Sequence, residues 1–232
     1  MPVTEIATCP LKAGANIGDP NDQTAAVLSS LCDDLRATDG MQQLHFGTRM
    51  EDPTMLELVL DWDTLKHHQT FMASDIYGPF MNRLNSICEG NVSGMHIDFV
   101  PVGGLSKTLS APATEVPPFT SAVPVLHTDF ELQIATFYFD GEPESDYTDN
   151  VAKLDKALQG IDGYLGYTIG ITHETLEKED FKGKAAVLTI GWQSREAHMA
   201  FRETQAYKDN IHLLRSNSKK ITMWHVQFMQ SL

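Results

Sequence analysis

Some short stretches of the chain alternate between hydrophobic and polar residues, whereas others repeat a hydrophobic residue every three or four positions. The clearest alternation runs from Met55 to Trp62, where four large apolar side chains would point to one side of an extended chain. In Asn21–Arg36 the leucines instead lie three and four residues apart, which is typical of an amphipathic helix. The first hundred residues therefore predict a mixed unit of strands and helices.

These patterns predict the order βαββαβ with the second helix broken in two, a ferredoxin-like arrangement of the α+β class. Asp52-Pro53 turns the chain into the third strand, and Asp63 or Thr64 can cap the helix that follows it. Strands are predicted at Val3–Leu11, Gln42–Met50, Met55–Trp62 and Gly94–Pro101. The last helical stretch carries Phe80, Leu84 and Ile87.

The segment that begins at Trp62 occurs a second time at Trp192. The two segments read WDTLKHHQTFMASDIY and WQSREAHMAFRETQAY. An offset of 130 residues aligns Trp62 with Trp192, Thr64 with Ser194, His68 with His198, Phe71 with Phe201 and Tyr77 with Tyr207. Upstream, Gly40 and Gly163 align at an offset of 123, because the second copy has the longer loop THETLEKEDFKGK. Such self-similarity predicts two copies of one module.

The second copy repeats the predicted elements of the first. Its third strand is predicted at Ala185–Trp192, and its first helix carries the apolar stripe Tyr147, Val151, Leu154 and Leu158. We expect the first module at residues 1–101, a connector rich in proline and glycine at 102–123, and the second module at 124–232.

Helices can cover only one face of each predicted sheet. The other face would expose a large apolar patch unless something packs against it. The second copy offers a matching surface, so we expect the two sheets to face each other about a pseudo-twofold axis as an intramolecular dimeric α/β barrel. The pattern leaves open whether this pseudo-dimer is a monomer or pairs again as a homodimer.

The charge of the chain narrows the classes of partner, and its cysteines indicate the redox environment. The net charge of −14 and the pI of about 4.9 disfavour binding to nucleic acid or to an anionic membrane. No segment approaches the roughly 20 apolar residues of a membrane span. Cys9, Cys32 and Cys88 are widely spaced and have no counterparts in the second copy. They indicate buried thiols in the cytosol, with a catalytic thiol as the alternative.

With both copies aligned, the chain resembles the dimeric α/β barrel superfamily, and within it proteins with antibiotic-biosynthesis-monooxygenase-type (ABM) domains in tandem. The resemblance rests on the pattern W-x-[ST]-x3-H-x2-F-x5-Y, which occurs in both halves. It implies a pocket between the sheet and the helices of each module. It also implies one of several activities: cofactor-free oxygenation, polyketide cyclisation, haem degradation or isomerisation, or none.

The resemblance argues against haem. Haem-degrading members carry a tryptophan where this sequence has Phe71 and Phe201, and a histidine where it has Met81 and Ile211. Neither His67-His68 nor Asp61-x-Asp63 has the spacing of metal ligands on one helix, and no phosphate-binding glycine motif occurs. We therefore expect no cofactor and no metal.

Six side chains are candidates for proton transfer: Tyr77, Tyr207, His68, His198, His45 and His96. Polyketide cyclases of this fold place an acid–base histidine where this sequence has the two tyrosines. Candidate walls of a substrate site are Trp62, Phe71, Leu56, Trp192 and Phe201. The alternative for each is a structural role, such as core packing, helix capping or a hydrogen bond to a neighbouring strand.

His45 and His96 are expected on the sheet face that the helices do not cover, because their neighbours along each strand turn apolar side chains the other way. In the second copy Thr168 takes the place of His45, whereas His225 takes that of His96. The alternatives for this face are a hydrogen-bonded network between the sheets and a proton-transfer site in the first module only.

We expect a cofactor-independent small-molecule enzyme, an oxygenase or cyclase that acts on an aromatic or polyketide-like compound of secondary metabolism. The alternative is a non-catalytic small-molecule-binding or stress-response protein of the same fold. A third hypothesis is that one module alone is active, since duplicated modules can diverge.

Overall fold

The computed structural model describes residues 1–100, 126–127, 131–178 and 181–230. These residues form two compact units. The first unit contains residues 1–96, 126–127 and 227–230, and the second contains residues 97–100 and the described residues from 131 to 226. The connector predicted at 102–123 lies outside the described residues, and the domain boundaries at 101 and 124 stay predictions.

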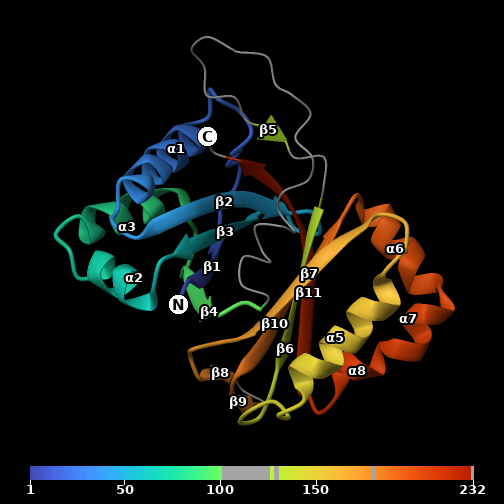
Figure 1. Cartoon of the computed structure of the whole chain (residues 1–232). Helices are drawn as coiled ribbons and strands as arrows, with labels where there is room; N and C mark the ends of the chain where they lie inside the picture. The colour runs from blue at the N-terminus through green and yellow to red at the C-terminus, as the bar shows by residue number, and fades with distance from the viewer. Residues whose placement is uncertain (101–125, 128–130, 179–180, 231–232) are drawn as a thin grey trace. The chain divides into compact units, whose positions relative to one another are not determined.

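The first unit has the predicted order of elements. It runs through β1 (Val3–Pro10), α1 (Gln23–Arg36), β2 (Met41–Arg49), β3 (Met55–Trp62), α2 (Leu65–Met72), α3 (Tyr77–Ile87) and β4 (Ser93–Ile97). Its strands are ordered β4-β1-β3-β2, and β3 is antiparallel to β1 and β2. Figure 1 shows α1, α2 and α3 on one side of these strands. The short strand β5 (Leu126–His127) pairs with the last residues of β11 (Lys220–Gln230).

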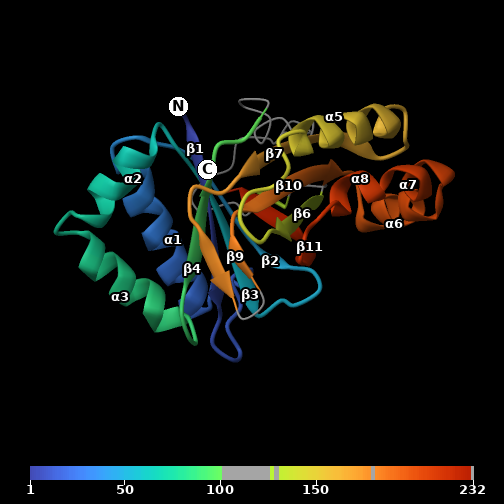
Figure 2. The same cartoon turned by 90° about the horizontal axis from the view of Figure 1, so that it is seen from below.

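The second unit repeats this order. It runs through β6 (Glu131–Tyr138), α5 (Tyr147–Leu158), β7 (Tyr164–Ile171), β10 (Ala185–Trp192), α6 (Arg195–Glu203), α7 (Gln205–Asn210), α8 (His212–Arg215) and β11. Its strands are ordered β11-β6-β10-β7. The longer loop forms the hairpin of β8 (Leu176–Lys178) and β9 (Phe181–Gly183). Figure 2 shows α5, α6, α7 and α8 gathered on one side of β7 and β10.

Both units are ferredoxin-like βαββαβ modules, so the predicted α+β class and the tandem arrangement are confirmed. Within the described part of the chain, no helix combines the length and the apolar character that crossing a membrane requires.

In both units the junction between the third strand and the next helix is built in the same way. Thr64 and Ser194 are the N-caps, and each side chain accepts a hydrogen bond from the backbone N–H three residues later. Gly40 and Gly163 have φ of +81° and +77°, and each carbonyl accepts a hydrogen bond of 2.8 Å from the residue after the tryptophan. A Cβ at Gly40 would lie 2.3 Å from the His67 ring. Glycine is therefore needed there both for its φ and for space.

A hydrophobic core lies between the sheet and the helices of each unit. The predicted apolar face of β3 is confirmed, because its residues pack with the leucines of α1. The first core includes Leu28, Leu31, Leu35, Leu56, Leu58, Leu60, Trp62, Phe80 and Leu84. The second includes Tyr147, Val151, Leu154, Leu158, Leu188, Trp192 and Phe201. Burying one leucine stabilises the fold by about 1.5–3 kcal/mol. The three cysteines are buried thiols outside any disulfide, as predicted.

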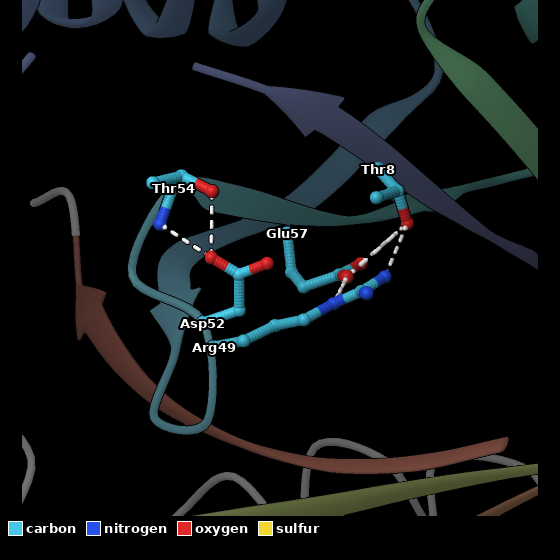
Figure 3. Close-up of polar contacts among 5 residues, drawn as sticks. All are labelled: Thr8, Arg49, Asp52, Thr54 and Glu57. Atoms are coloured by element: carbon cyan, nitrogen blue, oxygen red, sulfur yellow. Dashed lines mark hydrogen bonds and ion pairs between the residues drawn. The ribbon is translucent and has the colours of Figure 1, made fainter. Parts of the chain in front are cut away.

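The opposite face of β3 holds a buried carboxyl group. Glu57 is 0% exposed, and it accepts hydrogen bonds from Arg49 Nε at 2.5 Å and from Thr8 Oγ1 at 2.9 Å. Figure 3 shows these three side chains meeting beside the turn in which the Asp52 carboxylate is bonded to Thr54. Burial raises the pKa of Glu57 to about 7, although the Arg49 charge and the hydrogen bonds oppose this shift.

This pKa makes stability depend on pH. The unfolded chain loses the Glu57 proton near pH 4.5, whereas the folded chain keeps it to about pH 7. The contribution to stability is full below pH 4.5 and is lost as the pH rises through 7. Between pH 5 and pH 8 this effect lowers the unfolding free energy of the wild type by roughly 2–3 kcal/mol. We expect Glu57→Gln to lack this decrease, because glutamine does not titrate.

Urea unfolding of both proteins at each pH measures this difference. Glu51→Gln is the matched control, because Glu51 is exposed in the adjoining turn. Parallel pH profiles for the wild type and Glu57→Gln would contradict the raised pKa.

Candidate functional site

The predicted Trp–His–Phe–Tyr stretch has the same geometry in both units. Trp62 and Trp192 end their strands and are both 0% exposed. His68 stacks on Trp62 with ring centres 4.9 Å apart, and His198 stacks on Trp192 at 5.2 Å. A shift in strand register lies beside each tryptophan, between Met41 and Gln43 in one unit and at the Gly191/Trp192 step in the other. Such irregularities redirect side chains at the end of a strand.

The next two aromatic positions also match. Phe71 meets the Tyr77 ring edge-on with centres 5.4 Å apart, and Phe201 meets Tyr207 at 5.5 Å. Burial and then the charge of Glu5 raise the pKa of Tyr77, so its hydroxyl stays protonated at neutral pH. Leu56 is 0% exposed and belongs to the first core. Its role as a substrate contact stays a prediction.

A carboxylate in the first unit is replaced by an amide in the second. Trp62 Nε1 donates to Glu5 Oε2 at 3.2 Å, and Trp192 Nε1 donates to Gln133 Oε1 at 3.0 Å. His68 Nε2 lies 3.4 Å from the same Glu5 oxygen. The two clusters therefore share a shape and differ by one negative charge.

Each cluster ends in a pair of histidines. His68 Nδ1 lies 2.6 Å from His96 Nε2, and His198 Nδ1 lies 2.8 Å from His225 Nε2. From the sequence, His96 was expected on the face that the helices leave uncovered. This expectation was wrong, because His96 contacts His68 of helix α2. Strand alternation determines which residues share a face, but not which face the helices cover. A histidine in this position needs hydrogen-bond partners, and His68 supplies one on the helix side.

His45 is separate from these clusters. Its neighbour Leu44 belongs to the first core, so His45 points to the other face, as predicted, where its ring centre lies 6.1 Å from that of Phe228. Burial lowers the pKa of His45 to about 4. The ring is therefore neutral near pH 7 and a weak base.

A cavity of about 150 Å³ lies between the sheet and the helices of the second unit. Four predicted site residues line it, and the sequence did not predict the other lining residues as part of a site. The predicted residues are Trp192, His198, Phe201 and Tyr207, and the additional polar ones are Gln133, Arg202 and Arg215. The repeat could have revealed the additional residues, because the first copy has Glu5, Met72 and Asn85 at their positions.

Arg202 and Arg215 add positive charge to the lining of the cavity. Arg202 lies over the Tyr207 ring, with its guanidinium carbon 5.9 Å from the ring centre. Arg215 is exposed at the end of α8. A cavity lined by aromatic rings, a histidine and two cations suits an aromatic ligand that carries a partial or full negative charge.

No protein-family model matches the sequence, and no curated protein matches it. Solved structures do match in fold. An anthrone oxidase-like protein has a TM-score of 0.69 and 10% identity, with 100% of this chain and 92% of that chain covered. A candidate monooxygenase from Fusobacterium nucleatum has a TM-score of 0.59 and 14% identity, with 100% and 96% covered.

A candidate monooxygenase from Lactobacillus acidophilus has a TM-score of 0.54 and 12% identity, with 98% of this chain and 93% of that chain covered. At these identities the matches establish the fold and leave the activity open. The chain therefore shares the fold of these three solved structures, and it carries two ferredoxin-like modules in tandem.

Proposed function

We propose that the second unit binds a small aromatic compound with an acidic hydroxyl group and acts on it without a cofactor, as an oxygenase or cyclase. The observation that carries this proposal is the cavity bounded by Trp192, His198 and Tyr207. The names of the structural neighbours, two candidate monooxygenases and an anthrone oxidase-like protein, support the same class of chemistry.

The size of the cavity limits the ligand. A closed apolar cavity of about 150 Å³ in another protein is large enough for benzene. The volume here is also about 150 Å³, so it accommodates one aromatic ring. A polycyclic compound would enter with one ring and leave the others outside, unless the helices moved apart.

The polar groups supply a route for a proton. When His198 Nδ1–H donates to His225 Nε2, the lone pair of His198 lies on Nε2 and can accept a proton from the ligand. The imidazolium is then stabilised by its hydrogen bond to His225. Arg202 and Arg215 favour the phenolate that remains. An ionised phenol is more electron-rich and therefore more reactive toward oxygen or an internal electrophile.

Two measurements test this proposal with phenol, catechol and hydroxynaphthoquinones as probes. Calorimetry is expected to show binding, and an oxygen electrode or product analysis is expected to show turnover of at least one probe. His198→Gln should lower turnover by about 10²–10⁴-fold, because it removes the base. Arg202→Met introduces the residue that the first copy has at the equivalent position. It should weaken binding of the ionised probes about fivefold.

Lys208→Met is the control for charge, since Lys208 is exposed on the neighbouring helix α7. Full turnover by His198→Gln would show that His198 is not the base. Binding without any turnover would favour the alternative of a non-catalytic small-molecule-binding protein.

A further inference from the structure

Three metal-ligating side chains converge in the first unit. Glu5, His68 and His96 each offer one ligand atom, and these atoms all lie within 4.8 Å of one another. They come from β1, from α2 and from β4, and they are separated by 63 and 28 residues in the sequence. No short motif contains them, which explains why the spacing of histidines and acids along the chain predicted no metal.

The packing around the cluster holds the ligand groups in place. Trp62 Nε1 donates to Glu5 Oε2, which orients the carboxylate, and the Trp62 ring stacks against His68. His68 is 6% exposed. Hydrogen bonds from a second layer of residues and restricted ring positions are typical of metal sites, because they reduce the cost of ordering the ligands.

We propose that Glu5, His68 and His96 bind one divalent transition-metal ion of the Zn²⁺ class. Two imidazole nitrogens and one carboxylate oxygen are a donor set that such ions accept, and they leave a fourth position for water. Ligand atoms around tetrahedral Zn²⁺ are about 3.3 Å apart. The widest separation in the cluster, within 4.8 Å, therefore has to shorten by at most about 1.5 Å, and the hydrogen bond of 2.6 Å between His68 Nδ1 and His96 Nε2 has to open. Rotations of the histidine rings change both separations.

The second unit supplies a comparison within the same chain. Its histidine pair has nearly the same geometry, and its tryptophan makes the equivalent hydrogen bond, but the acceptor is Gln133. A neutral amide is a much weaker ligand for these ions than a carboxylate, and it does not offset the charge of the ion. The second unit is therefore expected not to bind the metal.

Zn²⁺ titration of the tag-free, chelator-treated full chain tests the proposal. Calorimetry should give one site in the wild type. Glu5→Gln should weaken binding at this site by more than about a hundredfold, since loss of a direct ligand costs at least as much as loss of a supporting residue. Gln133→Glu should give two sites. Co²⁺, which absorbs visible light, should show the d–d spectrum of nitrogen and oxygen ligation. Its intensity should correspond to one site in the wild type, none in Glu5→Gln and two in Gln133→Glu.

Both substitutions exchange side chains that one unit or the other already accommodates, and circular dichroism verifies that each variant is folded. Stoichiometries of one, zero and two support the proposal. It is overturned if the wild type binds no Zn²⁺, if Glu5→Gln binds as tightly as the wild type, or if Gln133→Glu adds no site. Because Gln133→Glu keeps the native first unit, it remains informative should Glu5→Gln fail to fold.

Discussion

Replacing Trp62 by alanine is expected to lower the free energy of unfolding by about 3–5 kcal/mol. The side chain is 0% exposed and contacts both His68 and Phe71. Alanine would leave a cavity in the first core and would remove the N–H that donates to Glu5. Urea unfolding followed by far-ultraviolet circular dichroism measures the loss without relying on tryptophan fluorescence.

Trp62→Phe separates the two causes, because it keeps an aromatic ring and removes only the N–H and part of the volume. Its cost should be smaller, about 1–3 kcal/mol. If Trp62→Ala cost less than about 1 kcal/mol, the tryptophan would not be part of a packed core, and the duplicated strand-to-helix junction would lose its proposed role in stability.

The second large effect is expected at Gly170, on β7. A Cβ at this position would lie 2.2 Å from Ile97 Cγ2 and 2.6 Å from the backbone oxygen of Asp98. Beside it, Ile169 and Val100 exchange backbone hydrogen bonds of 2.8 and 3.0 Å. Backbone cannot move aside as a flexible side chain can, so Gly170→Ala should cost about 3 kcal/mol and separate residues 97–100 from β7.

Hydrogen exchange of the Val100 and Ile169 amides is the specific measurement, because both should lose protection in Gly170→Ala. Gly78→Ala is the control. A Cβ at Gly78 in α3 meets nothing within 4 Å, and alanine favours the helix. Unchanged protection of both amides in Gly170→Ala would show that residues 97–100 do not pair with β7.

The sequence repeat was sufficient to predict the architecture, because the features that it preserves are structural. Trp62 and Trp192 and the helix caps recur at an offset of 130 residues, Gly40 and Gly163 recur at an offset of 123, and together they build the same junction twice. Alternation along β3 also predicted correctly which of its residues enter the core. These are local properties of the chain, so a periodic pattern can reveal them.

The candidate sites were only partly predictable, because they depend on contacts between distant segments. His96 was expected on the wrong face of its sheet, since the strand pattern does not identify the side on which His68 lies. Arg202 and Arg215 are polar residues on helices, and nothing local distinguishes them from solvated surface charges. Comparing the copies position by position would have identified both arginines and the exchange of Glu5 for Gln133.

One scaffold is present twice in this chain, and we propose that the cavity in its second copy binds an aromatic compound. A crystal structure of the chain soaked in phenol tests this most directly. We predict density for one ring against Trp192 and Phe201, with the hydroxyl oxygen within hydrogen-bond distance of His198. A cavity that stays empty or filled only with water at saturating phenol would contradict the claim.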